Sequence, residues 1–146
     1  MKQKKKSCLK NMVVSMKSNI LLDTNIVIRL LVRDNEEQFI IAEAFFKDLE
    51  LGRKSAILLE IIVGEIIYVL KSVYKQKKAL IKSQLELLFE YDYLHIENRY
   101  IMREALKVYT LKNIDFADAI LCAKNKLEGH EVFSFDKDIR KCTKEK

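Results

Sequence analysis

Residues 20–33 decide the fold class of this chain and read ILLDTNIVIRLLVR. The first three residues form a short apolar run typical of a buried strand, and Asp23 ends that run. From residue 24 to residue 33 the apolar side chains recur at helical spacing, so the stretch predicts a strand followed at once by a helix. A strand that leads directly into a helix is the unit from which α/β folds with parallel sheets are built.

The same alternation continues along the whole chain. Four runs have the composition of strands, namely Ile20–Leu22, Ala56–Leu59, Tyr93–Ile96 and Glu131–Phe135. Helical patterns lie between them at 24–33, 36–51, 60–75, 78–90, 98–112 and 116–128. Short apolar strands that alternate with helices predict an α/β fold with three layers, in which helices cover both faces of a central, mostly parallel four-stranded sheet.

The composition indicates one folded domain with a basic extension. A chain of 146 residues without proline and with three glycines favours long helices over a turn-rich sandwich or barrel. The net charge is +6, but residues 1–18 hold six lysines and no acid, so the rest has 27 − 6 = 21 basic residues against 21 acids. The charge therefore gives no support to RNA binding. We interpret 1–18 as a disordered extension, either an over-long start or a basic arm, and 19–146 as the domain.

The cysteines and the hydropathy predict a reducing, cytoplasmic setting. Cys8, Cys122 and Cys142 have no paired spacing, and neither histidine is near them, so zinc sites and disulfides are not expected. No apolar run reaches the length of a membrane span, because Ala56–Leu70 is interrupted by Glu60, Gly64 and Glu65.

Four acids from distant segments are expected at one edge of the sheet. Asp23 follows the first strand, Glu65 lies on the helix after the second, Asp118 lies near the start of the last long helix, and Asp136 follows the fourth strand. In open α/β sheets, functional groups gather at the carboxyl ends of the strands. These acids are therefore the candidate site.

Each acid also has a structural explanation. Asp23 and Asp115 suit helix N-caps, and Asp118 falls where a capping box would place an acid. Glu65 has apolar helical neighbours, which predicts either a buried salt bridge or a functional carboxylate. Asp136 is a common turn residue at the end of a strand.

Taken together, the acids indicate a metal site. Several carboxylates at one place repel one another and raise each other's pKa unless a cation neutralises them. Hard oxygen ligands without histidine or thiolate favour Mg²⁺ or Mn²⁺. Ions of this kind activate water and stabilise the leaving oxygen of a phosphodiester.

Four segments of the chain resemble a known family. Residues 16–35, MKSNILLDTNIVIRLLVRDN, resemble the opening of PIN-domain proteins, especially the VapC-type toxins. LLEIIVGEIIYVL at 58–70, NIDFADAILCAKN at 113–125 and VFSFDKDI at 132–139 are similar to the later acidic motifs of that family, in the same order. The 15 residues before Met16 are not part of the pattern.

The resemblance implies roles for particular residues. It makes Asp23, Glu65 and Asp118 metal-binding acids and Asp136 a more variable fourth, all four forming the catalytic cluster. It makes Asp115 an accessory metal ligand. The small polar residues that orient such a site correspond to Thr24, Asn25 and Ser134. The family also implies a PIN-like fold, Mg²⁺- or Mn²⁺-dependent cleavage of RNA, a homodimer and a cognate antitoxin protein.

Arg29 and Arg33 follow the first motif at helical spacing. We expect one of them to face the phosphate backbone of RNA, and the alternative is a surface salt bridge with Asp34 or Glu37.

Three other functions are alternatives to that of a toxin ribonuclease. A haloacid-dehalogenase-like phosphotransferase requires a second Asp two residues after the first, where this chain has Asn25. A PIN-like adaptor would bind RNA or protein without cutting, and such proteins usually lack one or more of the acids. A PIN nuclease of RNA processing or repair would share the chemistry but have no antitoxin.

Overall fold

The computed structural model describes residues 20–143, so the basic extension predicted at 1–18 lies outside the described residues. Within this range the strands are β1 (Ile20–Leu21), β2 (Ala56–Leu58) and β3 (Leu94–Ile96). The helices are α2 (Thr24–Leu31), α3 (Glu36–Glu50), α4 (Glu60–Ser72), α5 (Lys78–Phe89), α6 (Arg99–Leu111), α7 (Phe116–Glu128) and α8 (Lys137–Thr143).

The strands form one parallel sheet in the order β1-β2-β3. Ile20 is opposite Ala56, and Ala56 is opposite Leu94 on its other side. Each crossover between neighbouring strands consists of two helices, α2 and α3 or α4 and α5. The parallel α/β fold is therefore confirmed, and the carboxyl ends of all three strands lie at the same edge of the sheet.

The predicted fourth strand is wrong. Residues 131–135 are not a strand, and the sheet built from residues 20–143 has three strands. The apolar, β-favouring composition of this segment was not sufficient, because a strand exists only where a partner backbone accepts its hydrogen bonds. Phe133 and Phe135 are instead 93% and 91% exposed. The three-layer arrangement stays a prediction.

The helices agree closely with the sequence patterns. The six predicted helices begin within one residue and end within three residues of the observed ones. α8 was not predicted, because its seven residues are too few to show a period. α7 ends at Gly129, whose φ of +71° is a left-handed conformation that glycine adopts without strain.

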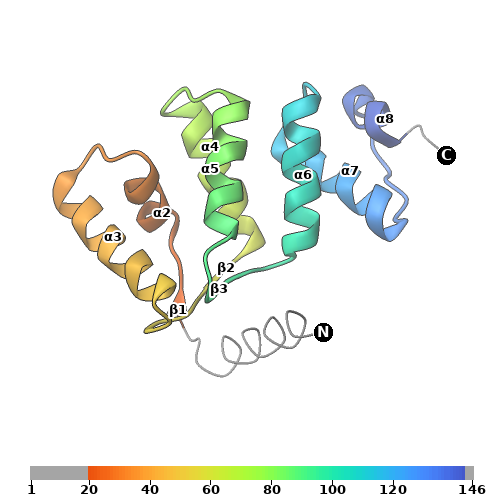
Figure 1. The fold of residues 1–146 in the computed structure, drawn as a ribbon. Coiled ribbons are helices and arrows are strands. Elements are labelled where there is room, and N and C mark those ends of the chain that lie inside the picture. The colour runs from red at the N-terminus through yellow and green to blue at the C-terminus, as the bar shows by residue number, and fades with distance from the viewer. Residues whose placement is uncertain (1–19, 144–146) are drawn as a thin grey trace, which may run out of the picture.

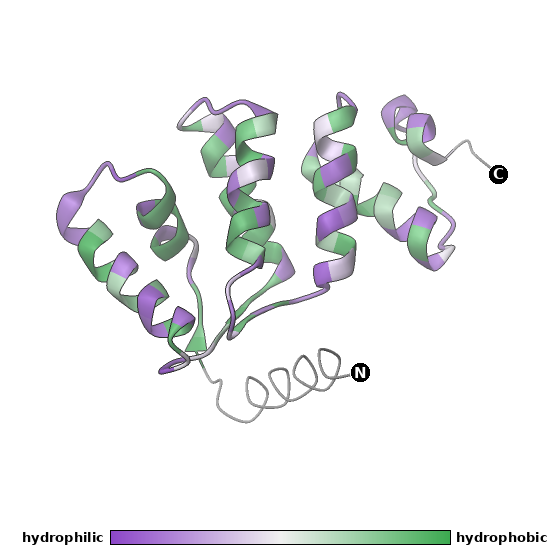
Figure 2. Ribbon diagram, in the orientation of Figure 1, coloured by the Kyte–Doolittle hydropathy of each residue, from purple (hydrophilic) through white to green (hydrophobic). Residues whose placement is uncertain are grey.

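The helices α4 and α5 form a pair in the middle of the described part of the molecule (Figure 1). Figure 1 shows α2 and α3 on one side of this pair and α6, α7 and α8 on the other. α4 contacts α2 on one side and α7 on the other. Figure 2 shows hydrophobic and hydrophilic residues sharing each helix, as expected for helices with one buried side. The largest fully buried side chains include Tyr109, Phe46, Phe89, Ile28 and Leu49.

Two cysteines lie together, contrary to expectation. Cys122 on α7 and Cys142 on α8 are joined as a disulfide, with their Cα atoms 5.7 Å apart. The spacing of the cysteines did not indicate this pair, because the contact depends on α8 folding back onto α7 across 20 residues. None of the helices in residues 20–143 combines the length and the apolar composition of a membrane span.

Candidate active site

The first group of predicted residues surrounds the turn from β1 into α2. Asp23 occupies the N-cap position of α2 with an extended backbone, but its side chain makes no capping hydrogen bond and is exposed. Thr24 is only 4% exposed, and its Oγ1 donates a hydrogen bond of 2.5 Å to Oε2 of Glu65. Asp23, Thr24 and Glu65 therefore form one group, which we call the β1 half-site. Asn25 is exposed in the first turn of α2.

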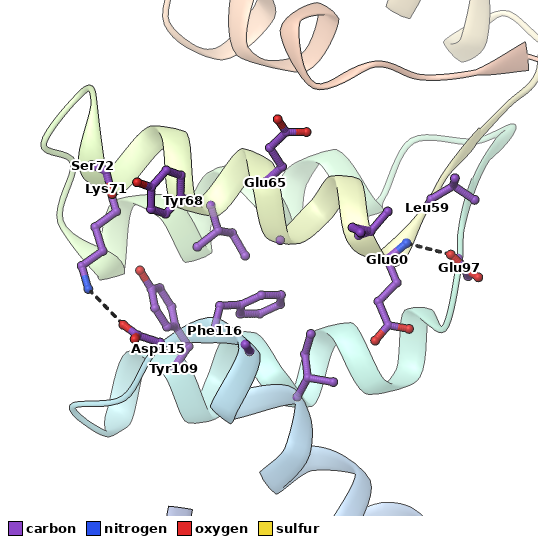
Figure 3. A pocket seen from close by; sticks show the side chains of 15 residues that line it. Leu59, Glu60, Glu65, Tyr68, Lys71, Ser72, Glu97, Tyr109, Asp115 and Phe116 are labelled. Atoms are coloured by element: carbon purple, nitrogen blue, oxygen red, sulfur yellow. Dashed lines mark hydrogen bonds and ion pairs between the residues drawn. The ribbon is translucent and has the colours of Figure 1, made fainter. Parts of the chain in front are cut away.

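Glu65 is not buried, which corrects the expectation from its apolar neighbours. The side chain is exposed on α4, and within residues 20–143 it forms no ion pair. Figure 3 shows Glu65 pointing away from Tyr109 and Phe116, which lie on the other side of α4. The helix therefore presents the carboxylate to the β1–α2 side and to solvent, where a ligand can reach it.

The second group lies where α7 and α8 begin. Asp118 is half-buried in the first turn of α7. Burial raises the pKa of Asp118, and repulsion from Asp136, Asp115 and Asp138 raises that pKa further. We call Asp115, Asp118 and Asp136 the α7 half-site. Its acids are close enough to disfavour one another's charge.

Asp136 and Ser134 are held by the turn that starts α8. The backbone N–H of Asp136 donates to Oγ of Ser134 at 3.0 Å, and Oδ1 of Asp136 accepts from the N–H of Asp138 at 2.8 Å. The turn role considered for Asp136 is thus present. Asp138 pairs with Lys141 at 2.6 Å.

Asp115 stands at the N-cap position of α7 without a side-chain capping bond. Its side chain is 85% exposed and lies 4.0 Å from Nζ of Lys71. An ion pair at that distance and exposure contributes little to stability. Asp115 is therefore available to a ligand.

Within residues 20–143 the two half-sites form no assembled metal cluster. No group of three or more His, Cys, Asp or Glu side chains within residues 20–143 is arranged to hold a metal ion. Figure 1 shows α4 and α5 between the start of α2 and α7. A largely apolar groove of about 1230 Å³ lies between α4 and the α6–α7 pair, with Glu65 and Asp115 among the residues that line it. The donor types suit Mg²⁺ or Mn²⁺, and the gathering of these acids into one metal site stays a prediction.

Both candidate substrate arginines make ion pairs within the chain. Arg29 donates to Asp34 at 3.0 Å, which is one of the two salt bridges considered as the alternative. Arg29 also donates to the hydroxyl of Tyr74 at 3.1 Å. Arg33 pairs with Glu36 at 2.7 Å, rather than with Glu37. Contact of either arginine with RNA stays a prediction.

Sequence reasoning missed two features beside the half-sites. Phe133 and Phe135 were assigned to a strand, although the alternation Phe-Ser-Phe before Asp136 also permits an exposed aromatic pair, and their rings are 5.8 Å apart. The second feature is Lys78, the first residue of α5. Its Nζ donates to the carbonyl oxygen of Ile114 at 2.7 Å, and it lies 4.1 Å from the centre of the Tyr109 ring.

Comparison with known proteins identifies the family. The PIN domain model matches residues 20–145, which is most of the chain, so the protein belongs to the PIN domain family. A curated VapC ribonuclease of Aquifex aeolicus (strain VF5) is 29% identical over 122 residues, covering 83% of this chain and 90% of the relative. No solved structure matched the chain.

Proposed function

We propose that the chain is an Mg²⁺- or Mn²⁺-dependent endoribonuclease that hydrolyses RNA and acts as the toxin of a toxin–antitoxin pair. The observation that carries this proposal is the α7 half-site, where burial raises the pKa of Asp118 and repulsion from Asp136, Asp115 and Asp138 raises it further. Like charges held together in this way destabilise the fold and are relieved by a bound cation. The membership of the PIN family and the likeness to a VapC ribonuclease support the same activity.

Each residue of the two half-sites has a role in this proposal. Asp23, Glu65 and Asp118 would hold the metal, Asp136 and Asp115 would assist it, and the positions of these acids would be supported by Thr24, Asn25 and Ser134. When bound, Mg²⁺ or Mn²⁺ supplies an activated water and neutralises charge on the phosphodiester. The side chains of this chain contribute the negative charge that selects a divalent ion and the hydrogen bonds that fix the acids, such as Thr24 to Glu65.

The remaining features of the proposal follow from the VapC type. The protein would act in the cytoplasm on an RNA substrate, would be silenced by a cognate antitoxin protein and would form a homodimer. The likeness to the VapC ribonuclease of Aquifex aeolicus supports this set of partners.

The test is cleavage of a mixed small-RNA substrate in Mg²⁺, in Mn²⁺ and in EDTA. Wild type, Asp118→Asn and the control Glu86→Gln would be compared, the control being an exposed acid on α5. Metal-dependent cutting by the wild type and the control, but not by Asp118→Asn, supports the proposal. Cutting in EDTA, or no cutting by the wild type in either metal, contradicts it.

A PIN-like adaptor that binds without cutting is the second candidate. One observation favours it, namely that the described part of a single chain contains no assembled metal cluster. An adaptor would bind RNA in a mobility-shift assay with the same affinity in EDTA and in Mn²⁺, and it would leave the RNA intact. Cleavage that depends on Asp118 would exclude this alternative.

A further inference from the structure

Two cysteines at the C-terminal end of the described chain lie close enough to react with each other. Cys122 on α7 and Cys142 on α8 have Cα atoms 5.7 Å apart. A disulfide spans Cα separations of roughly 4.4–6.8 Å, so the bond forms without movement of either helix. Figure 1 shows α7 and α8 together at one end of the described chain, and the two helices are in contact. Cys122 follows Asp118 by one helical turn, so the bond joins α8 to the face of α7 that carries Asp118.

The short helix α8 depends on few attachments to the rest of the protein. Its seven residues are too few to form a stable helix in isolation. Ile139 buries its side chain, and Nζ of Lys112 donates a hydrogen bond of 3.1 Å to the carbonyl oxygen of Lys141 at the surface. The ion pair between Asp138 and Lys141 lies within α8 and does not attach the helix to α7. Breaking the bond between the two cysteines therefore removes a main attachment of α8.

The bond also closes a loop that carries part of the candidate site. Residues 129–136, between α7 and α8, form no helix or strand and begin at Gly129, which has a left-handed backbone. Ser134 and Asp136 both lie in this segment. A crosslink between the ends of such a segment removes many of the conformations that are otherwise open to it. The bond between the cysteines therefore limits where Asp136 can lie.

Each cysteine can also exist as a thiol in this structure. Sγ of Cys142 lies 3.2 Å from the carbonyl oxygen of Ile139, which can accept a hydrogen bond from the thiol. Cys122 is 2% exposed in the hydrophobic core, where a free cysteine packs as a small hydrophobic residue. Cys142 is half-buried, so a small reagent reaches its sulfur more easily than the sulfur of Cys122. Both the oxidised and the reduced form are therefore compatible with the packing of α7 and α8.

We propose that Cys122 and Cys142 form a reversible redox switch, which fixes α8 and residues 129–136 against α7 when oxidised and releases them when reduced. In a reducing cytoplasm, the setting that the sequence predicts, disulfides are usually transient and redox-sensing. The oxidised form keeps Asp136 near Asp118, whereas the reduced form lets Asp136 move away. The inference does not rest on the proposed function, because it concerns the attachment of a segment and not the cutting of RNA.

A low-molecular-weight thiol and its disulfide are the reactants that open and close the switch. In reduction, the thiolate of a small thiol attacks Sγ of Cys142, the bond to Cys122 breaks, and the Cys122 sulfur leaves with the electron pair and takes up a proton. A second small thiol then attacks the small-molecule sulfur of the mixed disulfide, which frees the Cys142 thiol and forms the small disulfide. The protein disulfide gains two electrons, and two small thiols are oxidised. Oxidation of the protein follows the same steps in reverse.

The first test measures the bond itself. Wild type and the control Cys8→Ser would be equilibrated with reduced or oxidised glutathione, and the free thiols would be alkylated and mapped by mass spectrometry. We expect both proteins to form the Cys122–Cys142 bond in oxidised glutathione and to lose it in reduced glutathione, while circular dichroism shows that they stay folded. The double variant Cys8→Ser/Cys142→Ser should form no intramolecular bond. The inference would be overturned by no bond in excess oxidised glutathione, by a bond to Cys8 in its place, or by a bond that reduced glutathione opens only after unfolding.

The second test measures what the bond holds in place. Trypsin cleavage after Lys137 and Arg140 in α8 would be timed for the oxidised and reduced forms of Cys8→Ser, with cleavage after Lys82 on α5 as the internal control. We expect cleavage in α8 to be about tenfold to hundredfold faster in the reduced form, because the loop constraint no longer opposes local opening. Cleavage after Lys82 should not change, and Cys8→Ser/Cys142→Ser should be cut at the fast rate in both buffers. Equal rates of cleavage in α8 for the two forms would overturn the inference.

Discussion

Thr24 and Glu65 lie 41 residues apart and are joined by a hydrogen bond of 2.5 Å from Oγ1 to Oε2. The bond connects the first turn of α2 to the middle of α4, and it places the Glu65 carboxylate at the start of α2, beside the residue that follows Asp23. Thr24 is buried, so solvent has little access to replace this bond. It is a positioning residue, since it acts through Glu65.

Removing the Thr24 hydroxyl should weaken metal binding with little effect on the fold. Thr24→Val keeps the shape of the side chain but leaves Glu65 without its donor. We expect about a tenfold to hundredfold loss of Mn²⁺ affinity, the usual effect of losing a group that orients a metal ligand. Thr24→Ser keeps the hydroxyl and should bind Mn²⁺ almost as the wild type does. Equal affinity of the valine and serine variants would contradict the role.

Asp23→Asn should abolish RNA cleavage and leave the fold intact. The Asp23 side chain is exposed and makes no capping bond, so its charge contributes little to the structure. Loss of a metal ligand removes several kcal/mol of charge stabilisation, or roughly 100- to 1,000-fold in rate. Cleavage rate and thermal unfolding would be measured on the same preparation. Full activity of a folded, metal-loaded Asp23→Asn protein would refute the assignment.

Asp118→Asn should stabilise the protein without metal. The pKa of Asp118 is raised by burial and by its acidic neighbours, so at neutral pH its charge destabilises the folded state. This destabilisation is absent at a pH below the pKa of Asp118 in the unfolded chain. It grows as the pH rises through the pKa of Asp118 in the folded protein. We expect the variant to melt about 1–4 °C higher than wild type at pH 7 in EDTA, with the difference vanishing near pH 3.

Asp48→Asn is the control for that measurement and should change stability in the opposite direction. The hydrogen bond from Lys54 lowers the pKa of Asp48, and Arg53 also contributes. Its charge therefore stabilises the fold above the unfolded pKa, and this contribution is lost as pH falls through the folded pKa. A lower melting temperature for both variants at pH 7 would show that Asp118 serves a structural ion pair instead.

Lys78→Met should loosen the attachment of α7. The variant loses the hydrogen bond to Ile114 and the cation beside the Tyr109 ring. A hydrogen bond from a charged group contributes about 1.5–3 kcal/mol, and partial exposure places this one near the lower end. Urea unfolding would measure the change. Lys77→Met is the matched control, because Lys77 is exposed and makes no side-chain capping bond. Equal stability of the two variants would contradict the role of Lys78.

Most of the fold could be predicted because period and composition determine local structure. The strand at Ile20 and the helix that follows it were visible in residues 20–33, and the later helices in their own apolar spacing. Residues 131–135 could not be assigned in the same way. A strand there requires a neighbouring edge, and α7 packs against α6 and carries the segment elsewhere. The Cys122–Cys142 pair was missed for the same reason. Both this pair and the course of residues 131–135 depend on how α7 and α8 pack.

The candidate site was predictable in its residues but not in its arrangement. The sequence identified Asp23, Glu65, Asp118 and Asp136 from their places after strands and at helix starts. It could not show that Glu65 belongs with Thr24 while Asp118 belongs with Asp136, because tertiary packing decides which helix faces which. It also misjudged the exposure of Glu65, since apolar neighbours at helical spacing do not fix which side of α4 is buried.

The sheet order has a consequence for how the chain reaches its native state. Each pairing joins distant residues: Ile20 with Ala56, 36 positions apart, and Ala56 with Leu94, 38 positions apart. The helix pairs α2–α3 and α4–α5 are local, and helices form within about a microsecond. Pairings of long sequence separation must close large loops before they gain any stabilisation, and they fold more slowly. The folding rate of this domain is therefore set by strand association, after the helices that later flank the sheet have begun to form.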